Sequence, residues 1–294
     1  MKKIILLAGP TASGKSALAL DWADQYEGEI VNSDSMQVYT ELHDITARPS
    51  PEEVARCPHH LYGVLQGDDP CSAERWRAMA YEVIEDIWAR GKTPIVVGGT
   101  GLYFKSLTDG LSEVPEIDEA IRQEIRTTAT SGTAPQSHAR LKELDPEMAG
   151  KLAPGDGQRI ARALEVVLST GKSLSYWQAI PPTGGLNERD DLEIGRHVTV
   201  MERAKLYARC DLRFRQMIEQ GNALQEVRDL MMQEYAPSLP VMKSLGVPQI
   251  IRYLREEIAL EEAITLSQTV TRQFAKRQMT WFRNQCGDWK LINL

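Results

Sequence analysis

Residues 4–16 read IILLAGPTASGKS and decide the fold. Residues 4–8 are a continuous apolar run, which is typical of a strand buried on both faces in a parallel sheet. The rest fits the pattern G-x-x-x-x-G-K-[ST], in which backbone N–H groups and a helix N-terminus hold a phosphate. We therefore expect a strand, a loop that binds a polyphosphate with Mg²⁺ ligated by Ser16, and a helix from Ser16 onward. The loop comprises Gly9, Pro10, Thr11, Ala12, Ser13, Gly14, Lys15 and Ser16.

Strands and helices alternate in the segments that follow. Residues 29–33 and 94–97 are short apolar runs and predict two further strands. Between them, apolar residues at helical spacing predict an amphipathic helix that begins after Ser72, a candidate N-cap, and ends at Gly91. This alternation predicts an α/β fold of the P-loop type, in which helices flank a parallel sheet.

The pattern changes after Gly110. From about residue 115 to about residue 191 the sequence predicts short helices and turns, with no convincing strand. A strand is expected again at residues 197–200, followed by helices. The P-loop core is thus expected in two parts, interrupted by an all-helical insertion. The expected borders are 1–113 for the first part of the core, 114–194 for the insertion and 195–294 for the helical completion of the core.

Composition limits the class of protein. The chain has 294 residues, of which 42% are hydrophobic and 26% charged, and its net charge is −7. These values exclude a disordered chain, a fibre and a membrane bundle, as well as a nucleic-acid binder that is basic throughout. The four cysteines form no C-x-x-C pair and have no zinc spacing. We expect a cytoplasmic protein with reduced thiols and no membrane segment.

Asp34 follows the second expected strand, at the sheet edge where open α/β sheets bind ligands. That position makes it a candidate general base beside the phosphate site, and capping of a following helix is an equally good interpretation. The strand at residues 94–97 runs into Gly98, Gly99 and Thr100, without the magnesium-binding Asp of ordinary P-loop ATPases. This ending disfavours an ATPase.

Several stretches together resemble the tRNA dimethylallyltransferases, in the order that this family has them. The matches run from Gly9 to Arg283, so the resemblance covers nearly the whole chain. One such motif alone would be weak evidence, but the ordered set is specific. The matching stretches are residues 9–16, 32–39, 46–49, 58–61, 97–103, 158–166 and 271–283.

Members of this family transfer a dimethylallyl group from dimethylallyl pyrophosphate to N6 of adenosine 37 in certain tRNAs. The resemblance implies this activity here, with Mg²⁺ as the cofactor and the anticodon stem-loop of tRNA as the partner. It also implies that the loop at residues 9–16 holds a pyrophosphate leaving group, gripped by Lys15 and Arg213. Asp34 would orient or deprotonate the N6 amine, with Thr100 beside the reacting centre. The tRNA contacts that the resemblance implies are Asp34, Ser35, Met36, Gln37, Thr100, Arg122, Gln158, Arg159, Ile160, Ala161, Arg162, Lys276 and Arg277.

Two basic segments would let an acidic protein bind tRNA. Residues 196–215 carry six basic and two acidic side chains, and residues 272–290 carry five and one. We expect these cations to contact phosphates, and the interleaved aromatic residues to belong mainly to the core. Arg159 and Arg162 project together from one helix and are candidates for an RNA clamp. His59 and His60 fit no metal pattern and are expected to be structural.

Three alternatives remain. An adenylate isopentenyltransferase would share the phosphate loop and the Asp34 region, but a free nucleotide needs no large helical insertion. A small-molecule P-loop kinase is disfavoured by the strand that ends at Gly98. A non-catalytic tRNA-binding protein would leave the loop and Asp34 without a purpose. We expect a monomer that encloses one tRNA stem.

Overall fold

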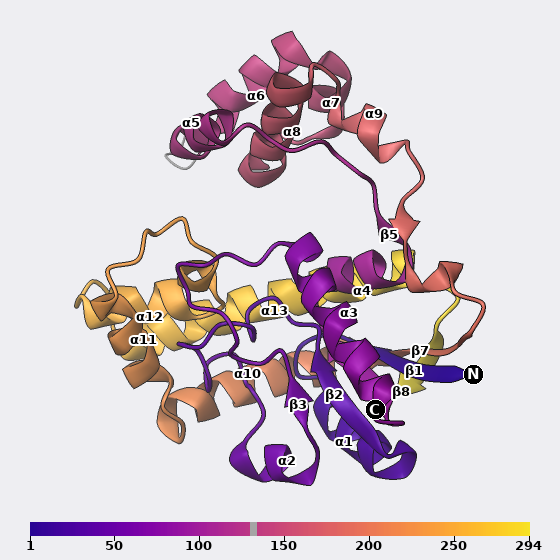
Figure 1. Ribbon diagram of the computed structural model, residues 1–294. Helices are drawn as coiled ribbons and strands as arrows, with labels where there is room; N and C mark the ends of the chain where they lie inside the picture. Colours follow the sequence, from indigo (N-terminus) through magenta and orange to yellow (C-terminus); the bar gives the residue numbers. More distant parts are fainter. Residues whose placement is uncertain (130–133) are drawn as a thin grey trace. The chain divides into compact units, whose positions relative to one another are not determined.

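The computed structural model describes residues 1–129 and 134–294, which form two compact units. The core comprises Met1–Leu107 and Arg189–Leu294, and the insertion comprises Thr108–Glu188 (Figure 1). The borders between the two units, at 107/108 and 188/189, differ from the expected borders at 113/114 and 194/195. The first lies earlier because β5 (Gly110–Leu111) already pairs antiparallel with β6 (Thr183–Gly184), near the far end of the insertion. This small ribbon also corrects the expectation that the insertion is helical throughout.

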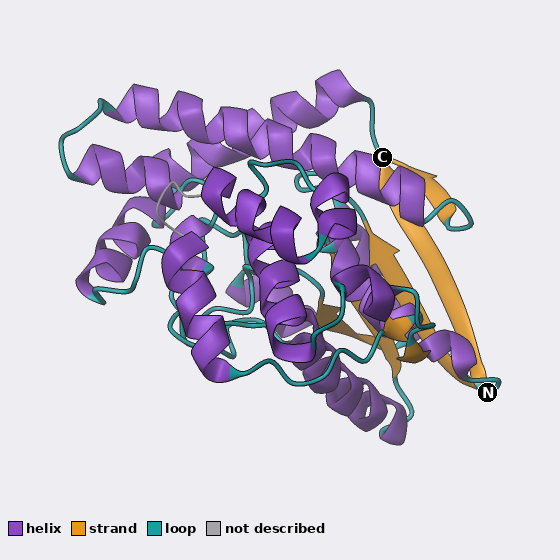
Figure 2. Ribbon diagram, turned by 90° about the horizontal axis from the view of Figure 1, so that it is seen from above, coloured by secondary structure: helices purple, strands orange, loops and turns teal. Residues whose placement is uncertain are grey.

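The core is built on a six-stranded sheet in the order β3-β2-β4-β1-β7-β8. Every neighbouring pair in it is parallel, and Figure 2 shows the strands side by side. The α/β prediction is confirmed. The strands are β1 (Lys2–Ala8), β2 (Gly28–Asn32), β3 (His59–His60), β4 (Thr93–Gly98), β7 (Leu192–Val200) and β8 (Lys290–Asn293).

The strand β7 is longer than the expected residues 197–200. It begins at Leu192 and pairs with β1 from Lys2 onward, along the whole length of β1. Charged residues such as Glu193 and Arg196 hide this strand from an apolar-run search, because burial along it is only partial before Val198. The second expected border, at 194/195, therefore falls inside a strand of the core.

The core helices cover both faces of the sheet (Figure 1). Ala19, Leu20 and Ala23 of α1 pack on side chains of β1, β2 and β4. The predicted helix at residues 73–90 is α3 (Ala73–Ala89), and Ser72 caps it by accepting a hydrogen bond from the Arg75 N–H. The core helices are α1 (Lys15–Tyr26), α2 (Pro51–Arg56), α3 (Ala73–Ala89), α4 (Gly101–Thr108), α10 (Arg203–Glu219), α11 (Ala223–Met232), the 3-10 helix η2 (Val241–Lys243), α12 (Val247–Leu254) and α13 (Leu260–Gln285).

The insertion has a hydrophobic core of its own. Ile125, Leu141, Ile160 and Leu164 are almost completely buried at its centre. In neither unit is a described helix both long and apolar enough to cross a membrane. The insertion helices are α5 (Glu119–Ala129), α6 (Ala134–Leu144), α7 (Pro146–Lys151), α8 (Gly157–Thr170), α9 (Leu174–Gln178) and the 3-10 helix η1 (Leu186–Glu188).

Candidate functional site

The phosphate loop joins the carboxyl end of β1 to the start of α1. Gly14 is its last residue before the helix and has a φ of 94°, in the left-handed region that glycine adopts without strain. The strand β7 anchors the loop, because the Thr199 hydroxyl donates a hydrogen bond to the Ser13 hydroxyl at 2.8 Å. Both side chains are buried. The loop ends at a helix N-terminus, whose free N–H groups favour an anion.

Two cations lie at this loop. The Lys15 ammonium donates to the Pro10 carbonyl at 3.3 Å, and the Arg213 guanidinium on α10 donates to the Thr11 hydroxyl. Burial lowers the pKa of Lys15 to about 8; nearby Asp34 opposes this shift and Arg213 adds to it. Burial also lowers the pKa of Arg213. Two desolvated positive charges beside a helix N-terminus make this place suited to an anion.

Asp34 lies in the loop that follows β2. Its N–H donates to the buried side-chain oxygen of Asn32 at 2.8 Å, and its Oδ1 accepts from the Met36 N–H at 3.0 Å. Residues 33–50 form an irregular loop and α2 begins only at Pro51, so the helix-cap interpretation of Asp34 is wrong. Its Oδ2 makes no hydrogen bond with any residue that the structure describes. One carboxylate oxygen is thus available to a ligand.

Thr100 holds the Asp34 loop from the next strand. Its N–H donates to the Ser33 carbonyl at 3.1 Å, and its hydroxyl accepts from the Ser35 N–H at 2.9 Å. Two of the residues that flank Asp34 are therefore bonded to Thr100. The structure brings together Lys15, Arg213, Asp34 and Thr100 around the carboxyl ends of β1, β2 and β4, as the sequence predicts.

Gln278 is a residue of this site that the sequence analysis missed. It lies on α13 and is 5% exposed. Its Oε1 accepts from the Thr11 N–H of the phosphate loop at 2.9 Å, and its Nε2 donates to the Gly99 carbonyl at 2.9 Å. Gln278 stands within the last family-like stretch, but no local pattern distinguishes it there from its polar neighbours. Only the folded chain shows that it joins two loops.

A cavity of about 230 Å³ opens beside the phosphate loop. Ser16 and Arg213 line it on the side of the phosphate loop, and three apolar side chains line it from α1, β2 and β4. Most of the other lining residues are polar or charged, so the cavity offers a ligand both polar groups and a small apolar surface. The lining residues are Ser16, Leu20, Ile30, Gln37, Ala47, Arg48, Pro49, Glu53, His59, Tyr62, Val97 and Arg213.

The predicted tRNA contacts in the core fall in two places. Ser35, Met36 and Gln37 are half-buried in the loop after Asp34, and the Gln37 amide donates to the Thr46 and Ala47 carbonyls at 2.8 Å each. Gln37 thereby holds the loop that it belongs to. Lys276 and Arg277 are exposed on α13.

The aromatic residues among the basic segments belong mainly to the core, as expected. Phe282 is 2% exposed and Trp289 is 8% exposed. Trp281 is half-buried, and its ring packs edge-on against Phe282. The exposed residues on the second half of α13 include the cations Lys276, Arg277 and Arg283.

The predicted contacts in the insertion lie on α5 and α8. Gln158, Arg159 and Arg162 are exposed, whereas Ile160 is fully buried in the helical core, so its side chain faces other helices. Arg159 and Arg162 each have an acidic neighbour on their own helix or at its cap, Asp156 and Glu165. In the same unit, Ala161 is half-buried and Arg122 forms an ion pair with Glu119 at 2.6 Å.

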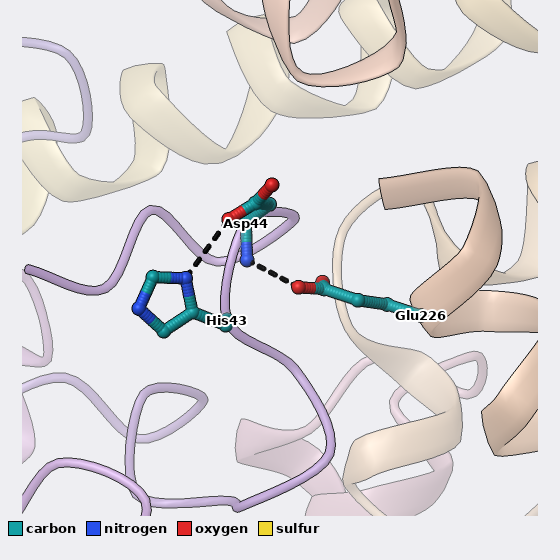
Figure 3. Close-up of side chains that lie close together, drawn as sticks. All are labelled: His43, Asp44 and Glu226. Carbon is teal, nitrogen blue, oxygen red and sulfur yellow. Dashed lines mark hydrogen bonds and ion pairs between the residues drawn. The ribbon is translucent and has the colours of Figure 1, made fainter. Parts of the chain in front are cut away.

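His43, Asp44 and Glu226 form a cluster of possible metal ligands that the sequence analysis did not predict (Figure 3). Glu226 accepts from the backbone N–H groups of Asp44 at 2.7 Å and Ile45 at 3.1 Å. Asp44 accepts from the His43 ring at 2.8 Å and from the Asn222 N–H. These bonds tie the loop after Asp34 to the start of α11. The cluster is therefore a structural clamp.

The histidines and cysteines have structural surroundings. His60 pairs with the buried Glu29 at 2.7 Å, and the His59 ring bonds the Cys57 carbonyl at 2.9 Å. All four cysteines are free thiols, and Cys57, Cys210 and Cys286 are buried.

The chain matches one family over most of its length. The family model described as IPP transferase matches residues 37–285, and one described as isopentenyl transferase matches residues 2–62. The tRNA dimethylallyltransferase of Parvibaculum lavamentivorans is 48% identical over 98% of this chain and 90% of that relative. The tRNA dimethylallyltransferase of a Caulobacter species is 45% identical over 99% and 92%.

Solved structures agree with these matches. A eukaryotic dimethylallyltransferase, described as acting on tRNA, has a TM-score of 0.81 and 30% identity, covering 100% of this chain and 74% of that one. The full-length tRNA isopentenylpyrophosphate transferase of Bacillus halodurans has a TM-score of 0.69 and 30% identity, covering 100% and 90%. The chain therefore belongs to the IPP transferase family, the family of the tRNA dimethylallyltransferases.

Proposed function

We propose that this chain transfers a dimethylallyl group from dimethylallyl pyrophosphate to N6 of adenosine 37 in tRNA and releases pyrophosphate. The names of its relatives support the activity and the tRNA substrate. The observation that carries the proposal is that Lys15, Arg213 and Asp34 lie around one phosphate loop, so that anion-binding cations adjoin a carboxylate with an available oxygen.

The reaction exchanges one bond for another. The C1–O bond of the allylic pyrophosphate breaks, and its electron pair leaves with the pyrophosphate. The N6 lone pair forms the new C1–N6 bond, and the amine then loses one proton. The site must therefore stabilise negative charge on the leaving group and accept a proton from the amine.

The cations and the loop would stabilise the leaving group. Lys15, Arg213 and the amide groups at the start of α1 lie together at the phosphate loop and would face the pyrophosphate as its charge grows. Mg²⁺, when bound, would neutralise further charge on the pyrophosphate oxygens. The residues present fit such an ion: Ser16 is exposed, and its hydroxyl makes no hydrogen bond with any described residue. A single protein ligand together with substrate phosphates is a usual arrangement for Mg²⁺.

Asp34 would act on the acceptor. Its Oδ1 is fixed by the Met36 N–H, which leaves Oδ2 to accept a hydrogen bond from the N6 amine and then its proton. A stacked base cannot reach this carboxylate, so adenosine 37 would have to be flipped out of the anticodon loop. Thr100 would keep Asp34 in place through Ser33 and Ser35.

The cavity beside the loop suits the donor. Ser16 and Arg213 in its lining would face the pyrophosphate, and Leu20, Ile30 and Val97 would face the short branched hydrocarbon. Exclusion of water from this space would protect the allylic carbon from hydrolysis.

The exposed cations would bind the RNA. Lys276 and Arg277 of the core are exposed, as are Arg159 and Arg162 of the insertion, and we propose that they contact phosphates. We further propose that the protein acts as a monomer in the cytoplasm, where tRNA is modified. A free adenine nucleotide as acceptor would leave these cations and the insertion without a role.

A transfer assay tests the function. Labelled dimethylallyl pyrophosphate and Mg²⁺ are supplied with unmodified tRNA, with AMP or with no acceptor, and ATP turnover is measured separately. We expect label in tRNA alone. Label in AMP would instead identify an adenylate isopentenyltransferase, and ATP turnover without prenyl transfer would identify a kinase or an ATPase.

A further inference from the structure

Gln278 connects the phosphate loop to the turn that contains Gly99 and Thr100. In the proposed reaction, the first would hold the leaving pyrophosphate and the second supports Asp34. The side-chain carbonyl oxygen of Gln278 accepts the Thr11 N–H from the phosphate loop, and its amide nitrogen donates to the Gly99 carbonyl, each at 2.9 Å. The side chain reaches both from α13 and is 5% exposed. A side chain buried this far cannot itself lie on the surface that binds RNA. Its two bonds are made to backbone, so they fix the paths of the loops.

The packing around Gln278 explains why residue 99 is a glycine. A Cβ built on Gly99 would lie 2.2 Å from the Gln278 Nε2, whereas its next neighbours would be the Gln278 Cδ and the Gly9 carbonyl oxygen at 3.4 Å each. The φ of Gly99 is not in the left-handed region, so its backbone would accept an alanine. The space that an alanine would need is taken by the amide of Gln278.

Each bond of Gln278 leads to a group proposed to act in transfer. On one side, the Thr11 hydroxyl also accepts a hydrogen bond from the Arg213 guanidinium. On the other side, Gly99 directly precedes Thr100, whose hydroxyl accepts the Ser35 N–H next to Asp34. The amide of Gln278 thus stands between the groups that grip the leaving pyrophosphate and those that hold the attacking amine.

We propose that Gln278 is a positioning residue, which sets the phosphate loop and the Thr100–Asp34 loop at the spacing needed for attack of N6 on the allylic carbon. This inference rests on the proposed function. Each substrate would still bind to its own groups without Gln278, but the two reacting atoms would no longer be held in line. A misplacement of about 1 Å costs roughly 100-fold in rate, and the loss should appear in kcat with little change in either KM.

A double-mutant cycle with Gly99 tests the proposal. Gln278→Ala and Gly99→Ala should each lower kcat for transfer to tRNA by about 10- to 100-fold, the second by displacing the glutamine amide. In the Gln278→Ala background the clash is removed and the nearest remaining neighbour is the Gly9 carbonyl oxygen at 3.4 Å, an ordinary contact, so Gly99→Ala should cost less than about 2-fold more. Additive losses would overturn the proposal, as would losses confined to the KM for tRNA.

Two controls separate positioning from stability and from the function itself. Gln268 lies on the same helix and donates to the Asp211 carbonyl at 3.0 Å, so Gln268→Ala removes a comparable bond that touches neither loop. It should lower the melting temperature less than Gln278→Ala, because it removes one hydrogen bond of a half-buried side chain instead of two of a buried one, and it should leave kcat unchanged. A loss of kcat in proportion to the loss of stability in both variants would mean that Gln278 only stabilises the fold. Failure of the unmutated protein to prenylate tRNA would refute the function, whereas an active protein with additive variants would refute only the role of Gln278.

Discussion

In the proposed reaction, single residues around the phosphate loop would each have a separate role. Lys15 and Arg213 carry charge, and Asp34 offers an oxygen that no described residue uses. Asn32 and Thr100 take no direct part in this reaction but fix the backbone on either side of Asp34. Each role can be removed by one substitution.

Substitution of Asp34 separates catalysis from binding. Asp34→Asn keeps the side-chain size and the acceptor for the Met36 N–H but removes the proton acceptor. We expect kcat to fall by about 10²- to 10⁴-fold, the usual contribution of a general base, while affinity for tRNA measured by filter binding changes little. A parallel loss of tRNA affinity would contradict the assignment of Asp34 as the base.

The lowered pKa of Lys15 predicts that anion binding depends on pH. Its pKa in the free protein is lowered to about 8, chiefly by burial, and only the protonated form attracts an anion. The affinity for inorganic pyrophosphate, measured by calorimetry, should therefore fall as the pH rises through 8. The guanidinium of a Lys15→Arg variant stays charged over this range, so its affinity should lack this inflection. The ionisation of pyrophosphate itself affects both proteins equally, and identical profiles would exclude Lys15 as the cause.

The residues that carry the site differ in how far the sequence could predict them. Lys15 and Ser16 belong to the loop pattern that follows one apolar run, and Asp34 follows the next, so local pattern and chain order place them. Gln278 and Thr199 act through contacts with residues far away in the chain, and one sequence records no such contact. Ile160 shows the converse: it sits among exposed arginines in the sequence, but helical geometry turns its side chain into the core.

At the scale of elements, β2 is fixed to its neighbours by a buried carboxylate. Glu29 is 4% exposed and receives hydrogen bonds from Arg90, which follows α3, and from His60 on β3. The sequence analysis assigned His60 a structural role without finding this partner, because strand pairing between β2 and β3 is what brings the two side chains together.

This contact predicts a stability that depends on pH. Burial raises the pKa of Glu29, but the hydrogen bonds from Arg90 and His60 outweigh burial and lower it overall. A lowered folded-state pKa stabilises the protein above the unfolded value of about 4.3 and ceases to do so as the pH falls through the folded value. Glu29→Gln should cost about 1–3 kcal/mol at pH 7 in urea unfolding, with the difference from the unmutated protein shrinking below about pH 4.

Glu27 supplies the control for this prediction. It pairs with Lys92 at 3.2 Å, but its side chain is 78% exposed. Glu27→Gln should therefore change the unfolding free energy by less than about 1 kcal/mol at either pH. Equal effects at Glu27 and Glu29 would mean that burial of the carboxylate does not matter.

At the scale of the whole molecule, the insertion begins and ends at one place. Gly110 lies opposite Gly184, and Leu111 lies opposite Thr183, so the chain leaves and returns through adjacent strands. The core sheet takes none of its strands from the insertion, whose hydrophobic core is separate. The sequence predicted an insertion, but not that its two ends pair.

Replacement of residues 112–182 by a two-residue turn should therefore leave a folded core. Asn-Gly favours the tight turn that joins two paired strands. The shortened protein should bind inorganic pyrophosphate with unchanged affinity and lose most of its affinity for tRNA, as measured by calorimetry and filter binding. Loss of pyrophosphate binding in a folded shortened protein would show that the insertion contributes to the donor site.

The anchors of the phosphate loop come late in the chain. The Thr199 side chain bonds Ser13, and the Gln278 side chain bonds Thr11. The loop that they anchor ends at residue 16, far earlier in the chain. During synthesis the loop therefore leaves the ribosome long before the residues that give it its shape, because its contacts span most of the chain. A nascent chain cannot form the finished loop until Gln278 on α13 has emerged, so the loop must stay without its final anchor while more than 260 further residues are synthesised.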